Sequence, residues 1–375
     1  MTATSALWVR HPGFYIKEEM AARGWLQRDL AFVLGVPEQG VNMILSGKRN
    51  ISPSMARALA DAFDTDKEFF ARLQLAYEMA HVPAPAPDIA TLGTLQSQYP
   101  VREMIKRGWL AQADARAMEQ QLASFFEVTT SDEIPYLAHA ARKGRYEERQ
   151  IPPPQLAWLF RVRQIARSIA VPTYSEQALR AAIGELELLL RAPEETRHVP
   201  RIMTACGVRY VVVQSLPKAR IDGVCFWIDS SPVIGMSLLR DTIDNFWFVL
   251  RHEIEHVLRK DGQYNEVIDE NLAREPETEI ANLPEEKAAN EAAANFCAPG
   301  QKLESFLARK RPFYYEKDVV AFARLHQRHP GLIVGQMQKR LHRWDYLTRH
   351  LVKIRQFVLP TAMADGWGQA FGADA

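Results

Sequence analysis

Two histidines and an acid near residue 250 have the types and spacing of a metal-dependent hydrolase. His252 and His256 are four residues apart, so on a helix both imidazoles lie on one face and can bind one metal ion. Glu253, beside the first histidine, is placed to accept a proton from a water molecule that such a metal activates. The motif predicts a metallopeptidase in which His252 and His256 are metal ligands and Glu253 is the catalytic base.

A hydrolytic site of this kind needs a third protein ligand and an open position for water. Glu291 lies among Ala and Phe residues on a predicted helix that begins near Leu283. Alanines let that helix approach another backbone closely, so we expect Glu291 to face inward as the third ligand. The alternative is that Glu291 is exposed, as we expect of Glu285 and Glu286. A set of two histidines and one glutamate suits zinc, with manganese also possible.

Short strands and one helix are predicted to hold this motif. Segments rich in β-branched and aromatic residues predict strands at Val208–Gln214, Gly223–Asp229 and Pro232–Gly235. A helix from about Asp241 to Arg259 then carries both histidines, and Asp261-Gly262 ends it. We expect Glu255 to pair with Arg251 on that helix, one turn away. Candidates by type for stabilising an oxyanion are Tyr264, Tyr314, Tyr315, His326 and His329.

This region resembles the ImmA/IrrE family of bacterial metallopeptidases over about Gly207 to Pro299. The resemblance rests on Gly207-Val-Arg-Tyr-Val-Val-Val, Ile221-Asp-Gly223, Pro232-Val-Ile, the His-Glu-Ile-Glu-His helix and the stretch from Glu291 to Phe296. It implies a zincin fold with His252, His256 and Glu291 as ligands and Glu253 as the catalytic residue. The chain departs from the family pattern after the second histidine, in the run from Val257 to Gly262 and the acidic segment that follows.

A run of short helices is predicted from His11 to about Ala80. Glycines end the first two helices, and prolines open later ones, as is usual for these residues. The predicted helices are Pro12–Arg23, Gln27–Leu34, one opened by Pro37, one from Ser52-Pro53 to Phe63, and one capped by Asp66 that runs to Met79.

This run resembles the HigA-type antitoxin branch of the XRE (lambda-repressor-like) helix-turn-helix proteins. The matching residues are His11-Pro-Gly13, Leu34-Gly-Val-Pro37, Gly47-Lys-Arg49 and the stretch from Phe69 to Gln74. The resemblance implies that the helix opened by Pro37 enters the major groove of double-stranded DNA, with the protein binding a palindromic operator as a homodimer. The residues expected at base edges are Glu38, Gln39, Asn42 and Met43, and those expected at phosphates are Gln27, Arg28, Lys48 and Arg49. The alternative is a five-helix bundle without a DNA role, because the recognition helix has no Lys or Arg.

The composition of the whole chain bears on the compartment and the partners that we expect for the protein. A net charge of +1 gives no global electrostatic argument for binding nucleic acid. Three cysteines without C-x-x-C spacing do not indicate a disulfide framework. The start has no signal-peptide pattern, and no apolar run reaches the length that spans a bilayer. We expect a cytoplasmic, nucleoid-associated protein with no membrane partner.

The predicted fold class is α+β, with four regions. They are an all-α helix-turn-helix domain at 1–80, a helical linker region at 81–200, a zincin-like metallopeptidase domain with a short sheet at 201–300, and a basic helical region at 301–375. The proline-rich stretch His81–Pro87 sets the first boundary.

Two functions of different classes follow from these regions. The first is a DNA-binding transcriptional regulator whose zinc-dependent peptidase cleaves a specific regulatory protein or toxin partner. The alternative is a non-catalytic repressor or antitoxin that uses the zincin fold to bind a ligand or partner. Further nucleic-acid contacts from the basic region Gln301–Pro360 are a third possibility, although its side chains are more simply surface and core.

Overall fold

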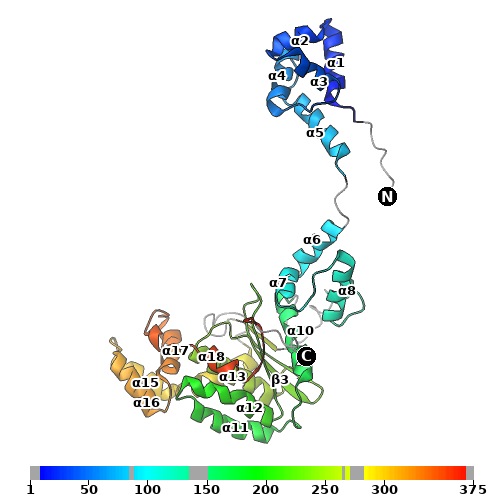
Figure 1. Cartoon of the computed structure of the whole chain (residues 1–375). Coiled ribbons are helices and arrows are strands. Elements are labelled where there is room, and N and C mark those ends of the chain that lie inside the picture. The colour runs from blue at the N-terminus through cyan, green and yellow to red at the C-terminus, as the bar shows by residue number, and fades with distance from the viewer. Residues whose placement is uncertain (1–8, 84–87, 135–150, 264–266, 271–282, 369–375) are drawn as a thin grey trace. The chain divides into compact units, whose positions relative to one another are not determined.

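The chain folds as two compact units, residues 1–87 and 88–375 (Figure 1). The computed structural model describes residues 9–83, 88–134, 151–263, 267–270 and 283–368. The division falls at the end of the proline-rich stretch His81–Pro87.

The first unit is a bundle of five short helices, as predicted. They are α1 (Pro12–Arg23), α2 (Gln27–Leu34), α3 (Glu38–Leu45), α4 (Pro53–Phe63) and α5 (Phe69–His81). Gly24 and Gly35 end α1 and α2 in the left-handed conformation that glycine adopts without steric cost. Apolar side chains from all five helices form one core, which includes Ile16, Leu30, Val41, Leu59 and Phe70. The last helix begins at Phe69 and its N-cap is Glu68, not the predicted Asp66, whose carboxylate accepts a hydrogen bond from the Glu68 amide.

A five-stranded mixed sheet lies at the centre of the second unit, in the order β4-β2-β3-β1-β5. The strands are β1 (Arg209–Val213), β2 (Ile221–Ile228), β3 (Ser231–Met236), β4 (Val267–Glu270) and β5 (Met363–Asp365). β1 pairs in parallel with β3 and β5, whereas β2 runs antiparallel to β3 and β4. The first three match the predicted strands, and the two edge strands are additional.

Helices cover both faces of this sheet, because alternate residues of a strand point to opposite sides. Val211 and Val213 of β1 pack toward α10 (Pro153–Ser168), while Tyr210 and Val212 join the core on the other face. That second face is covered by α11 (Glu176–Leu189), α12 (Val199–Ala205) and α13 (Ile243–Arg259), with η2 (Pro193–His198) before α12. The fold is therefore α+β.

The helices before the sheet are part of the same unit. They are α6 (Asp88–Gln98), α7 (Val101–Lys106), α8 (Ala115–Phe125) and the short η1 (Ser131–Glu133). Their apolar residues share one core with α10 and the sheet, so the region predicted as a linker is integral to this fold. Within this region the chain is not helical between α7 and α8, where Gly108 has a φ of 71°.

Helices also follow the sheet region. They are α14 (Pro284–Cys297), α15 (Gly300–Lys310), α16 (Glu316–Leu325), α17 (Pro330–Leu341), η4 (Thr348–His350) and α18 (Arg355–Val358). α15, α16 and α17 enclose a smaller core of their own, which includes Leu303, Phe322 and Met337. Among the described residues, no helix is both long and apolar enough to cross a membrane.

Candidate metal centre and nucleic-acid interface

The helix predicted to carry the metal-binding motif is α13. The motif side chains able to bind metal or transfer a proton are fully buried. His252, Glu253 and His256 each have 0% exposed surface. The helix is buried on most of its circumference between the sheet and α14, and apolar residues such as Trp247 and Ile254 accompany the polar ones. Such burial is costly for polar groups unless they find partners.

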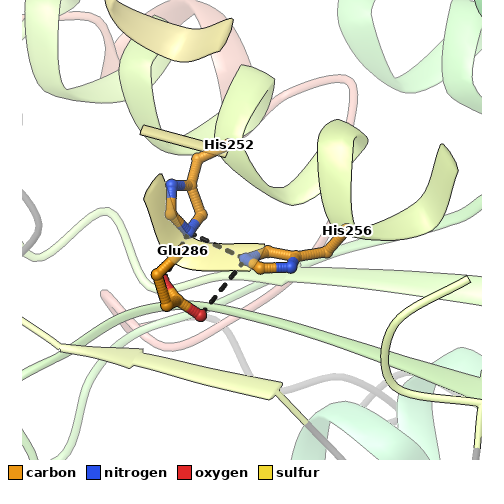
Figure 2. A group of neighbouring side chains, drawn as sticks. All are labelled: His252, His256 and Glu286. Atoms are coloured by element: carbon orange, nitrogen blue, oxygen red, sulfur yellow. Dashed lines mark hydrogen bonds and ion pairs between the residues drawn. The ribbon is translucent and has the colours of Figure 1, made fainter. Parts of the chain in front are cut away.

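Two of these side chains, His252 and His256, converge on one point with Glu286 of α14 (Figure 2). The Nε2 atoms of His252 and His256 are 3.0 Å apart. The two carboxylate oxygens of Glu286 each lie 3.5 Å from one of these nitrogens. A tetrahedral zinc site, with bonds of about 2.0–2.1 Å to nitrogen and oxygen, separates its ligand atoms by about 3.3–3.4 Å. The donor set and its spacing therefore fit a divalent metal.

The third member of the cluster is Glu286, so the prediction of Glu291 was wrong. Glu286 is 5% exposed and leads the buried face of α14, whereas Glu291 is exposed. At about 100° per residue, the offset of five positions rotates Glu291 about 140° away from Glu286 around the helix. Glu291 was chosen for its alanine neighbours, but those alanines lie on both faces of α14. The expectation that Glu286 is exposed was wrong for the same reason.

Small side chains bring Glu286 to the histidines. Ala289 and Ala293, which follow Glu286 on the buried face of α14, are both completely buried. Without larger side chains between them, α14 can pack closely against α13. The signal in the sequence was the spacing of Glu286, Ala289, Ala293 and Phe296, which is that of one helix face.

The position of the Glu253 side chain depends on a glycine in the neighbouring strand. Its carboxylate lies over Gly223 of β2: a Cβ added there would lie 2.9 Å from the Glu253 Cδ and 3.0 Å from a methyl group of Val249. The pairing of β2 with β4 is irregular between Ile221 and Gly223, as at a β-bulge. Only glycine at position 223 leaves enough room for the Glu253 carboxylate.

Other residues near the motif have structural roles. The predicted pair is confirmed, because Arg251 Nη2 lies 2.9 Å from Glu255 Oε2. Of the suggested oxyanion donors, Tyr264 lies outside the described residues. The others belong to the C-terminal helical region, where His326 packs on Phe322 and His329 caps α17.

The predicted recognition helix α3 presents two different faces. Val41, Ile44 and Leu45 are buried against the bundle. The residues predicted to read bases, Glu38, Gln39, Asn42 and Met43, are all exposed. Of the residues predicted at phosphates, Arg28, Lys48 and Arg49 are exposed and Gln27 is half-buried. These positions leave the predicted side chains available to a ligand, and their DNA contacts remain predictions.

Comparison with known proteins extends the evidence for the first unit. A helix-turn-helix family matches residues 16–70, from α1 to the start of α5. The chain is 35% identical over 79 residues to the virulence-associated protein A' of Dichelobacter nodosus, an alignment that covers 21% of this chain and 69% of that protein. No ImmA/IrrE family match accompanies these similarities.

Proposed function

This chain belongs to the helix-turn-helix family through its N-terminal unit, and we propose that it is a DNA-binding transcriptional regulator whose second unit is a metal-dependent peptidase. The DNA-binding part rests on the family match and on the exposed face of α3. The peptidase part rests on the convergence of His252, His256 and Glu286, with Glu253 on the same helix.

The residues of the buried cluster fit the work of peptide hydrolysis. A zinc or manganese ion held by His252, His256 and Glu286 would polarise the scissile carbonyl and acidify the attacking water. Glu253 would accept the proton of that water and deliver it to the leaving amine. The backbone of Gly223 would hold the Glu253 carboxylate in place during both transfers.

The DNA-binding unit limits what such a peptidase would act on. A protease attached to an operator-binding domain meets the proteins that regulate the same operon, so its substrate would be a specific regulatory protein or a toxin partner. The regulator would bind a palindromic operator as a homodimer, as helix-turn-helix proteins do when two half-sites lie one helical turn apart. It would work in the cytoplasm, at the nucleoid.

Glu253→Gln tests the proposal, because glutamine keeps the size of the side chain but cannot accept the proton. Metal content is measured by mass spectrometry on the purified parent and variant, and cleavage is measured on proteins encoded beside the gene and co-expressed with it. Glu255→Gln is the matched control, because it removes a carboxylate from the same helix that pairs with Arg251.

We expect both variants to bind one metal ion per chain and only Glu253→Gln to lose cleavage. A parent without stoichiometric metal would overturn the peptidase proposal. If the parent binds metal, neither the parent nor Glu253→Gln cleaves any of these proteins, and both regulate identically, the non-catalytic alternative replaces it, with the site binding a ligand or partner.

A further inference from the structure

The chain turns back on itself where α13 ends. Lys260 has a φ of 61°, the left-handed conformation that terminates a helix. The amide of Asp261 then donates a hydrogen bond of 2.9 Å to the carbonyl of His256. This turn carries the Asp261 carboxylate to the side of the His256 ring that faces away from the cluster, where Oδ2 lies 3.1 Å from Nδ1.

The sheet holds Asp261 from the other side. The indole Nε1 of Trp227 on β2 donates a 3.1 Å hydrogen bond to the Asp261 carbonyl. Gly262 has a φ of 75° and lies so close to the strand that an added Cβ would be 2.6 Å from the Cys225 carbonyl oxygen. Arg259 adds an ion pair of 3.4 Å to the same carboxylate oxygen. The end of α13 and strand β2 together fix the position of the Asp261 carboxylate.

A neutral imidazole carries its proton on one nitrogen and its metal-binding lone pair on the other. The His256 Nε2 points at His252 and Glu286 (Figure 2). Its Nδ1 lies on the other side of the ring, next to Asp261 Oδ2. An acid that accepts a hydrogen bond from Nδ1–H keeps the proton there and leaves Nε2 free as a ligand.

We propose that Asp261 is a positioning residue that fixes the tautomer and ring orientation of His256 for metal binding. The proposal rests on the proposed function, because it gives His256 its role as a ligand. Asp261 lies in the run Val257–Gly262, where this chain departs from the pattern it otherwise resembles. The acid that would orient His256 therefore belongs to the turn that ends α13.

Metal affinity tests the proposal first. Zinc dissociation constants are measured by competition with a coloured chelator for the parent, Asp261→Ala, Asp261→Asn and the control Glu255→Gln. We expect Asp261→Ala to weaken zinc binding by roughly 10–100-fold, the usual cost of losing such an outer partner. Asp261→Asn should lose less, because its amide oxygen still accepts the bond, and Glu255→Gln should match the parent. Circular dichroism confirms that each variant is folded.

The tautomer of His256 gives a second readout, which needs no metal. Two-bond nitrogen–proton correlation spectra of the metal-free protein are recorded well above the ordinary histidine pKa of about 6.5. We expect Nδ1–H in the parent and a shift toward Nε2–H in Asp261→Ala. An unchanged tautomer, together with zinc affinity equal to that of Glu255→Gln, would overturn the role of Asp261 and leave the metal site standing. If the parent binds no zinc, the metal site fails and this role for Asp261 is overturned with it.

Discussion

The carboxylate of Glu253 on α13 lies directly over the backbone of Gly223 on β2, in the space that any side chain at that position would occupy. Glu253 is fully buried, so it cannot move out into solvent without moving the helix that carries His252 and His256. The strand therefore determines where the proposed general base is held, although the base and its strand are distant in sequence.

Gly223→Ala is expected to separate catalysis from metal binding. The added methyl group must displace the Glu253 carboxylate. The three candidate metal ligands, His252, His256 and Glu286, are unchanged by this substitution. General acid–base catalysis contributes about 10²–10⁴-fold, so proteolysis should fall by roughly 10²-fold or more with bound metal unchanged. Gly184→Ala is the matched control, because no atom lies within 4 Å of an added Cβ there. Equal cleavage by both variants would contradict the role given to Gly223.

Replacing the two candidate acids of α14 in turn decides between them. Glu286→Ala removes a buried group that faces both histidines, so zinc affinity should fall by more than the roughly 10–100-fold cost of losing an outer partner. Glu291→Ala removes an exposed carboxylate from the same helix and should bind zinc as the parent does. Chelator competition measures both, and the reverse order of affinities would restore Glu291.

The motif helix was predicted correctly from the sequence, but its partner acid was not. A helix over Asp241–Arg259 follows from local periodicity, and the structure places it at Ile243–Arg259. The choice between Glu286 and Glu291 depends on which face of α14 meets α13, and that is a tertiary contact. The hydrophobic spacing of α14 indicated the right face, whereas the richness in alanine, which both faces share, did not.

The edge strands and Asp261 escaped prediction for a related reason. β5 has three residues and pairs with β1 far earlier in the chain, so local composition carries little signal for it. Asp261 was predicted only to end a helix, since nothing local relates its carboxylate to His256. Sequence identified the residues able to do chemistry, and long-range packing selected which of them meet.

Two substitutions in the first unit are expected to weaken DNA binding differently. Asn42→Ala should cost about 1–3 kcal/mol on the preferred operator by removing a base contact. Lys48→Ala should weaken binding to all sequences and reduce the salt dependence by about one ion. Fluorescence anisotropy on the gene's own promoter fragment measures both, with Lys67→Ala, on the connection before α5, as control. Unchanged affinity in both variants would remove α3 and the residues after it from the interface.

A half-buried acid near the start of α13, Asp244, predicts a pH effect on stability. Burial raises the pKa of Asp244 above its usual 3.8. Folding therefore favours the protonated form of Asp244. Its contribution to the free energy of unfolding is fully present below about pH 4 and is lost as pH rises through the raised pKa. Asp244→Asn lacks this titration and should gain stability relative to the parent as pH rises. Urea unfolding from about pH 4 to 8 measures the difference, and parallel curves would contradict it.

Removing the acid of β5 should destabilise the whole second unit. Asp365 is fully buried, where it pairs with Arg161 of α10 and accepts a 3.2 Å hydrogen bond from the Trp109 indole. Asp365→Ala leaves a largely buried guanidinium without this partner, which typically costs about 3–5 kcal/mol. Asp345→Ala breaks an exposed pair with Arg343 and should change stability little. Urea unfolding compares the two. Equal midpoints would mean that β5 and the helices before the sheet are not held together through Asp365.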